Sequence, residues 1–258
     1  MRQPLDKNEI LLHLGDLANK FDISFYPLTD STNRRARELA AAGPIDKPAV
    51  LLAQEQTAGR GRLGRSFLSE RGGIYISFLY FPRGCAGETV GITAEAAVKL
   101  SRAIDSSCGI QTGIKWVNDI YLNGKKIAGI LTEGEFDESG KLRYYIVGMG
   151  INVYKIEDFS SKIPIATTLE DEIKFAPDIN KLCAEIIKEM LSDEEGDTLL
   201  EYRERSVTLG ERVTVMAADP YEARAIEILD DYSLLVEQED GTRISVNSGE
   251  VSTSILKR

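Results

Sequence analysis

Arginine and glycine alternate in one short stretch of the chain, residues 59–66, which consists of Gly-Arg-Gly-Arg-Leu-Gly-Arg-Ser. Guanidinium groups donate hydrogen bonds in a planar fork that matches carboxylate and phosphate oxygens. Glycine lets the backbone bend sharply and come close to a ligand. The chain has a formal net charge of -10, so this positive cluster opposes the overall charge. We expect the stretch to bind an anion, and a solvated basic turn is the alternative.

Two nucleotide-binding patterns match this stretch by letters alone. Its glycines fit the G-x-G-x-x-G pattern of dinucleotide-binding folds, and residues 59–66 resemble a P-loop with Arg65 in place of the lysine. Both patterns require a helix that begins at the glycines and points its N-terminus at the phosphates. Here the chain continues into residues 74–80, an apolar run that predicts a strand. We therefore reject both patterns.

Composition limits the class of protein. The 258 residues, 43% hydrophobic and 28% charged, are typical of a soluble globular protein with one large domain, or one large and one small. An acidic chain is a poor match for DNA or RNA, because phosphate backbones require a basic surface. The cysteines, Cys85, Cys108 and Cys183, lack C-x-x-C spacing and indicate a reducing compartment. No apolar segment resembles a signal or a membrane span, so we expect a cytoplasmic protein without membrane partners.

The chain has a single histidine, His13. It falls in a short amphipathic segment near the N-terminus, where a residue at the helix surface or the core edge is the simplest interpretation. A Ser–His or Cys–His hydrolase mechanism therefore has little support. Catalysis should come from arginine, lysine and backbone groups.

Hydrophobic periodicity predicts helices and strands in mixed order. Helices are expected at 7–19, 34–42, 89–107, 179–191 and 197–205, and strands at 23–26, 49–53, 74–80, 126–133 and 142–153. Asn123-Gly124 predicts a type I′ hairpin, and Asp30, Ser31 or Thr32 should cap the second helix. Hydroxyls at that helix start could also bind a neutral polar ligand. The fold class is therefore α+β, with a mixed or antiparallel sheet flanked by helices.

The pattern of predicted secondary structure changes from about residue 209 onward. Short strands are expected at 212–216, 222–229, 234–237 and 243–246, separated by acidic turns. About fifty residues of this pattern predict a small β-barrel. We expect a catalytic domain at 1–207 and a β-barrel domain at 208–258.

Several motifs together resemble the biotin protein ligases, enzymes that adenylate biotin and attach it to a lysine of a carrier protein. The matching pieces are 30–33, 56–65, 72–75, 114–120, 126–131, 148–152, 166–169 and 249–252, in the order of the family. Val117 and Phe67 stand where the family usually has proline and tryptophan. The resemblance implies a class II synthetase-like catalytic domain, an SH3-like C-terminal barrel, and the short form without an N-terminal DNA-binding domain.

The implied reaction is ATP-dependent. Biotin would become biotinyl-5′-AMP with release of diphosphate, then pass to a lysine of a biotin carboxyl carrier protein or domain, with Mg²⁺ entering on ATP and a homodimer as one assembly. The chemistry suits a chain with one histidine, because a carboxylate is already a nucleophile. Such a reaction needs positioning and charge neutralisation rather than a general base.

The resemblance also implies roles for individual residues. The catalytic residues would be Lys115, Arg60 and Arg62. The residues that bind biotin would be Ser31, Thr32, Asn33, Gln56, Arg60, Gly61, Arg62 and Lys115. The residues that bind ATP would be Arg62, Arg65, Phe67, Asn118, Lys126 and Asn152, with no metal ligand from the protein. A surface position for Lys115 is the alternative, and its apolar neighbours weigh against it.

Two other functions remain open at this point. One is a lipoate ligase or octanoyltransferase of the same fold, and the other is a biotin sensor without catalysis. We also expect residues 55–69 to be mobile when empty and to close over the adenylate, with Leu63 and Phe67 as the apolar groups that tether them.

Overall fold

The structure is a computed structural model that describes residues 2–81, 89–192, 197–247 and 251–253. Its α-helices are α1 (Lys7–Leu14), α2 (Thr32–Ala41), α3 (Thr89–Cys108), α4 (Phe159–Lys162), α5 (Leu169–Ile173), α6 (Ile179–Leu191) and α7 (Thr198–Glu204). Short 3₁₀ helices cover Gly15–Lys20 and Arg62–Gly64. None of the described helices is both long and apolar enough to cross a bilayer.

Seven strands form the larger sheet. They are β1 (Asp22–Tyr26), β2 (Ala49–Ala53), β3 (Gly73–Tyr80), β4 (Gly113–Lys115), β5 (Asp119–Leu122), β6 (Lys125–Phe136) and β7 (Leu142–Asn152). The spatial order is β1-β2-β3-β7-β6-β5-β4. Only the β1–β2 pair is parallel among the described strands of this sheet. The prediction of a mixed sheet flanked by helices is confirmed.

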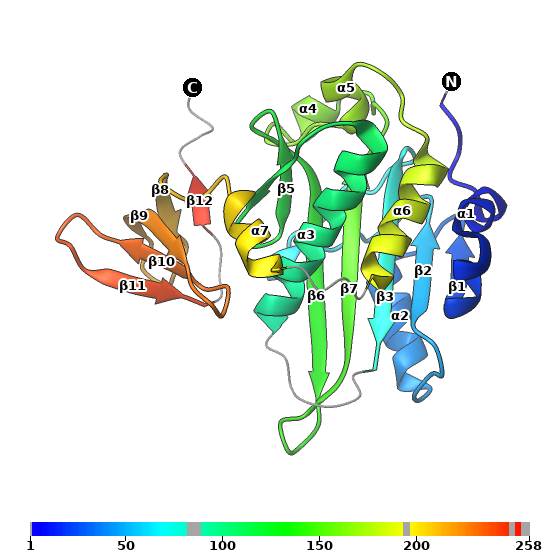
Figure 1. The fold of residues 1–258 in the computed structure, drawn as a ribbon, viewed down its shortest axis with the longest axis horizontal. Helices are drawn as coiled ribbons and strands as arrows, with labels where there is room; N and C mark the ends of the chain where they lie inside the picture. Colours follow the sequence, from blue (N-terminus) through cyan, green and yellow to red (C-terminus); the bar gives the residue numbers. More distant parts are fainter. Residues whose placement is uncertain (1, 82–88, 193–196, 248–250, 254–258) are drawn as a thin grey trace.

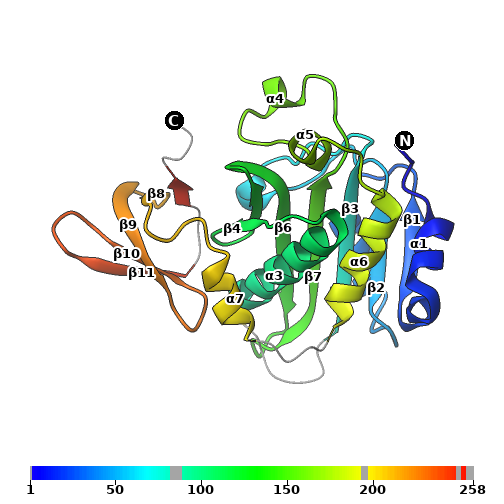
Figure 2. The same ribbon diagram turned by 45° about the horizontal axis from the view of Figure 1, so that its top comes forward.

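Helices cover both faces of this sheet. Helices α3 and α6 lie side by side on one face in both views (Figures 1 and 2), and α2 lies behind the sheet on the other (Figure 1). Strand β2 shows why, since Val50 and Leu52 join the large core while Ala49 and Leu51 join the smaller core under α2. Successive side chains of a strand point to opposite faces, so a strand covered on both sides is apolar throughout.

A smaller sheet follows near the C-terminus. Its strands are β8 (Arg212–Val215), β9 (Tyr221–Ile228), β10 (Leu234–Glu237), β11 (Arg243–Val246) and β12 (Val251–Thr253). They pair antiparallel in the order β11-β10-β9-β8-β12. The sheet contacts the rest of the protein through Tyr232, whose carbonyl accepts a 2.9 Å hydrogen bond from the Trp116 indole and whose ring packs edge-on against Tyr202.

Local signals in the sequence placed most element ends. Asn123 (φ 50) and Gly124 (φ 77) form the expected hairpin turn, and Asp178 caps α6 through the amides of Asn180 and Lys181. The first helix is shorter than the predicted 7–19, because it stops at Gly15 (φ 57) and continues as a 3₁₀ turn. Helices α4 and α5 were not predicted.

The start of α2 departs from the predicted cap in an informative way. Ser31 occupies the N-cap position, but its side chain makes no capping hydrogen bond. The amide of Thr32 is instead satisfied by Gln56 Oε1 at 2.7 Å, a residue that follows β2. Ser31 instead lines a cavity, which is described below.

Candidate functional site

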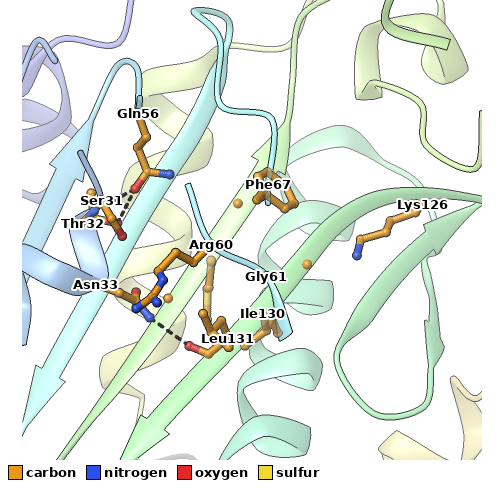
Figure 3. Close-up of a pocket in the computed structure, with 14 residues that line it drawn as sticks. Ser31, Thr32, Asn33, Gln56, Arg60, Gly61, Phe67, Lys126, Ile130 and Leu131 are labelled. Atoms are coloured by element: carbon orange, nitrogen blue, oxygen red, sulfur yellow. Dashed lines mark hydrogen bonds between the residues drawn. The ribbon is translucent and has the colours of Figure 1, made fainter. Parts of the chain in front are cut away.

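A cavity of about 440 Å³ lies where the start of α2 meets the surface of β6 and β7 (Figure 3). We call it the α2 pocket. Helix α2 contributes hydroxyl and amide groups to one side, and the arginine stretch lies across from them. Its lining residues are Ser31, Thr32, Asn33, Gln56, Arg60, Gly61, Phe67, Lys126, Gly129, Ile130, Leu131, Gly148, Met149 and Gly150.

Glycines form the floor of the α2 pocket. A Cβ added at Gly148 would collide with Asn33 Oδ1, and one at Gly150 would collide with the ring of Phe67. These positions must lack side chains so that Asn33 and Phe67 can lie flat on the strand. In the sequence these glycines stand out only as part of the motif at 148–152. Their spacing of two within a strand was the available signal, because it clears one face of the sheet.

The polar wall of the pocket is held by a hydrogen-bond network. Gln56 accepts from the Thr32 amide at 2.7 Å and donates to Ser69 Oγ at 2.9 Å. Asn33 donates to the carbonyl of Leu131 at 3.3 Å and to Glu133 Oε2 at 2.9 Å. These bonds tie α2 and the segment after β2 to β6, so the polar groups are fixed before any ligand arrives.

A second cavity of about 850 Å³, the α4 pocket, adjoins the first. Its residues come from the arginine stretch and the residues after it, the start of β6, the end of β7 and the segment around α4: Gly61, Arg62, Arg65, Ser66, Phe67, Leu68, Lys126, Asn152, Phe159, Ile163, Ile165 and Ala166. Aromatic and aliphatic side chains line it together with Arg62 and Arg65. Such a site suits a ligand with a flat apolar part and an anionic part.

Both cavities share Gly61, Phe67 and Lys126 in their linings. The Lys126 ammonium lies 2.6 Å from Asp119 Oδ1 on the neighbouring strand. Phe67 packs edge-on against Tyr75, with ring centroids 6.4 Å apart. A ligand that spans both cavities would therefore pass between a backbone amide, an aromatic ring and a positive charge.

The arginine stretch forms a turn and no α-helix within the described residues 59–72. Gly61 donates to the carbonyl of Arg65 at 2.7 Å, and Phe67 donates to that of Gly59 at 2.9 Å. This geometry confirms that both nucleotide-binding patterns matched by letters alone. The Leu63 side chain is 70% exposed, so the expectation that it tethers the stretch is wrong. Its backbone lies in the left-handed region, with φ 53.

Lys115 and Asn118 lie outside the linings of both pockets in the described part of the chain. Lys115 sits on β4 with only 9% of its surface exposed, and its ammonium is 5.8 Å from the ring centroid of Tyr121. Asn118 accepts a 3.0 Å hydrogen bond from Arg62 Nη1 and donates to the carbonyl of Ile130 at 2.8 Å. Every other predicted site residue lines at least one pocket.

Two shifted pKa values describe the surroundings. Burial acts to raise the pKa of the Asp30 carboxyl, but hydrogen bonds from the Ser31 amide and the Thr29 hydroxyl, with nearby guanidinium groups, hold it below its usual value. Burial raises the pKa of the Tyr75 hydroxyl, which donates to the carbonyl of Glu70 at 2.6 Å. Asp30 is thus an anion near neutral pH that orients the start of α2, and Tyr75 is a neutral support for Phe67.

Comparison with known proteins finds a matching family and several similar sequences. Residues 25–152 match the model of the Biotin/lipoate A/B protein ligase family. The Bacillus spizizenii protein named bifunctional ligase/repressor BirA is 38% identical over 168 residues, which cover 64% of this chain and 51% of the relative. The biotin–[acetyl-CoA-carboxylase] ligase of Mycobacterium tuberculosis is 29% identical over 97% of this chain and 96% of the relative.

Solved structures of biotin protein ligases are also similar to this chain. The biotin protein ligase from Aquifex aeolicus in complex with biotin and ATP superposes with a TM-score of 0.75 at 27% identity, covering 90% of this chain and 98% of that one. The chain spans about half the length of the Bacillus relatives it matches, with 51% of each covered.

Proposed function

We propose that this protein is an ATP-dependent biotin protein ligase, and the match of residues 25–152 to the Biotin/lipoate A/B protein ligase family supports the proposal. It activates biotin as biotinyl-5′-AMP and transfers biotin to a lysine of a biotin carboxyl carrier protein. The observation that carries the proposal is the pair of adjoining cavities, one with a fixed polar wall and one with apolar and arginine sides, which meet at Lys126. The Aquifex aeolicus relative holds biotin and ATP, which supports the same pair of substrates here.

Biotin occupies the α2 pocket in this proposal. The hydroxyls of Ser31 and Thr32 and the backbone around Gln56 lie where the ureido ring would bind. Ile130 and Met149 provide apolar surface for the thioether ring and the valeryl chain. The carboxylate end then points toward the shared residues of the two pockets.

ATP occupies the α4 pocket. Phe159, Ile163 and Ile165 provide apolar surface for the adenine, and Asn152 supplies a polar group at the end of β7. Arg62 and Arg65 line the same cavity and would bind the phosphates. Any Mg²⁺ would be held by the phosphate oxygens of ATP and would reduce the negative charge of the phosphates.

The first reaction step takes place between the pockets. A biotin carboxylate oxygen attacks the α-phosphorus of ATP, the bond from that phosphorus to the β-bridging oxygen breaks, and diphosphate leaves. Arg60 neutralises the biotin carboxylate, and the Lys126 ammonium neutralises charge on the equatorial oxygens. In the second step the carrier lysine attacks the carbonyl carbon of the mixed anhydride, and AMP leaves.

The proposal assigns the reacting lysine as Lys126, although the sequence favoured Lys115. Lys126 lines both cavities, whereas Lys115 on β4 lines neither and is only 9% exposed. Lys115 pairs with Asp119 in the β4–β5 ladder, and Asp119 holds Lys126. In this proposal Lys115 is a positioning residue, because it lines neither cavity.

We propose further that the arginine stretch closes over the adenylate. Bound carboxylate and phosphate would relieve the repulsion between its guanidinium groups and offset the entropy lost on ordering. We also propose a domain division at 207/208, a class II synthetase-like catalytic part and an SH3-like closure of the smaller sheet. The antiparallel order of that sheet is consistent with such a barrel.

Diphosphate release from ATP tests this function, with biotin, lipoate and octanoate offered in parallel before any carrier protein is added. We expect release with biotin alone and accumulation of biotinyl-5′-AMP. Release with lipoate or octanoate instead would assign the protein to the other branches of the family. Biotin binding without diphosphate release would make it a sensor.

A further inference from the structure

The turn between β4 and β5 has buried backbone groups that the pairing of these two strands leaves unsatisfied. It consists of Trp116, Val117 and Asn118, since the β4–β5 ladder ends where Lys115 pairs with Asp119. Trp116 and Val117 are buried. A buried peptide group needs a hydrogen-bond partner, so other parts of the chain must satisfy this turn.

Two hydroxyl groups from beyond residue 200 supply partners for the turn. The Trp116 amide donates to Thr208 Oγ1 at 2.9 Å, and the Tyr202 hydroxyl donates to the carbonyl of Val117 at 3.1 Å. Tyr202 and Thr208 are both fully buried. Helix α7, which carries Tyr202, lies between the two sheets in both views (Figures 1 and 2). The turn is therefore held by side chains whose own positions are fixed by burial.

The last residue of the turn holds an arginine of the α4 pocket. Asn118 Nδ2 donates to the carbonyl of Ile130 at 2.8 Å, and Asn118 Oδ1 accepts from Arg62 Nη1 at 3.0 Å. A carbonyl only accepts and a guanidinium only donates, so both partners require the same orientation of the Asn118 amide. Arg62 lines the α4 pocket. A displacement of the turn would therefore move the oxygen atom that orients Arg62.

Tyr202 acts as a neutral hydrogen-bond donor to this turn. Burial raises the pKa of the Tyr202 hydroxyl, although the positive charge of Arg62 acts to lower it. A phenol with a raised pKa keeps its proton at neutral pH and can donate to the Val117 carbonyl. Phenylalanine in its place would keep the aromatic ring and remove that donor from a buried carbonyl.

We propose that Tyr202 and Thr208 are positioning residues for the nucleotide, because they fix the turn whose Asn118 orients Arg62 in the α4 pocket. This inference rests on the proposed function, which places ATP in that pocket. In the described part of the chain, Tyr202 and Thr208 line neither pocket, so they would act only through the turn. Neither the turn nor Arg62 lines the α2 pocket, so biotin binding should not depend on them.

The test measures the binding of a non-hydrolysable ATP analogue by calorimetry, and KM for ATP and for biotin in adenylate formation. Tyr202→Phe should weaken binding of the analogue and raise KM for ATP, each by roughly fivefold, which is typical of one hydrogen bond. KM for biotin should not change. Thr208→Val should act in the same direction, because it removes the acceptor of the Trp116 amide. Thr208→Ser keeps the hydroxyl and should retain the wild-type values.

Tyr80→Phe is the matched control for the loss of a tyrosine hydroxyl. Tyr80 is partly buried, and its hydroxyl donates to the carbonyl of Met190 on α6 at 3.3 Å. Tyr80 lines neither pocket. Tyr80→Phe should therefore leave both KM values and the binding of the analogue unchanged.

A double-variant cycle separates a positioning role from general support of the fold. If Tyr202 acts through Asn118, then Tyr202→Phe combined with Asn118→Ala should bind the analogue no more weakly than Asn118→Ala alone. Losses that multiply in the double variant overturn this inference. So do equal losses for the analogue and for biotin in a folded Tyr202→Phe protein.

Thermal unfolding, followed in parallel, identifies a variant that does not fold. If Tyr202→Phe does not fold, the comparison of Thr208→Val with Thr208→Ser decides, and equal binding of the analogue by these two overturns the inference. A wild-type protein that binds the analogue but forms no biotin-dependent adenylate overturns the proposed function alone, because the calorimetric comparison needs no biotin. A wild-type protein that does not bind the analogue overturns both.

Discussion

The two sides of the α2 pocket are built in opposite ways. The wall from α2 is buried and tied by side-chain hydrogen bonds to β3, β6 and the segment after β2. The arginine stretch facing it is a turn on the surface, with an exposed Leu63 at its tip. A neutral ring needs a fixed pattern of donors and acceptors. An anion needs positive charge, and arginines on a surface turn can move toward it after it binds. In the proposed function, the start of α2 therefore recognises the neutral ring, and the arginine stretch supplies the positive charge.

Lys126 stands between these two regions, and its replacement should have the largest effect. Lys126→Ala removes the charge shared by both cavities, and we expect the rate of biotinyl-5′-AMP formation to fall by roughly 10²–10³, the loss typical of one such donor. Biotin affinity without ATP should fall much less. Lys115→Ala serves as the comparison and should reduce the rate less, because Lys115 lines neither cavity. A larger loss in Lys115→Ala would restore it as the reacting lysine.

Gly150→Ala tests whether the floor of the α2 pocket must lack side chains. The added methyl would displace the ring of Phe67 and so disturb both cavities at once. Overpacking of about 1–3 kcal/mol predicts a rise of roughly 5- to 150-fold in KM for biotin and ATP together. Gly91→Ala in α3 is the control, because its added methyl meets Tyr232 at an ordinary 3.6 Å. Wild-type kinetics in Gly150→Ala would show that Phe67 moves without consequence.

Arg60→Gly changes the arginine stretch alone and leaves the wall from α2 intact. Loss of a charge-assisted hydrogen bond, about 1.5–3 kcal/mol, should speed release of the adenylate by roughly 10- to 100-fold. The released mixed anhydride would then modify exposed lysines of bystander proteins, which a blot with labelled streptavidin detects. Retention of the adenylate in this variant would mean that the sheet holds the product without the arginine.

Asn118→Ala should have the smallest effect of the series. Asn118 lies outside both cavities and orients Arg62 through a 3.0 Å hydrogen bond. Removal of a bond worth about 1 kcal/mol predicts a rise of roughly fivefold in KM for ATP, with KM for biotin unchanged. A matching rise in KM for biotin would show that Asn118 supports β6 rather than the arginine.

Local sequence signals predicted the strands around the arginine stretch and the polar start of α2, because alternation and capping act over a few residues. They did not show that Lys126 lines both cavities while Lys115 lines neither. That distinction depends on how β4, β5 and β6 pair, including a register shift between Ile120 and Tyr121. The contacts of Ser77 and Glu133 with Asn33 were also missed, since they join parts of the chain that are far apart in the sequence. The same is true of Tyr232, whose contact with Trp116 joins the two sheets.

Amide hydrogen exchange with and without biotinyl-5′-AMP tests the contrast between the two sides most directly. We predict that amides across residues 55–69 exchange quickly in the empty protein and become strongly protected with the adenylate. Amides of β3 around Ser77 should be protected in both states, because that wall is already fixed by its hydrogen bonds. Equal protection of residues 55–69 in both states, or ligand-dependent protection around Ser77, would contradict the division between a preformed wall and a closing stretch.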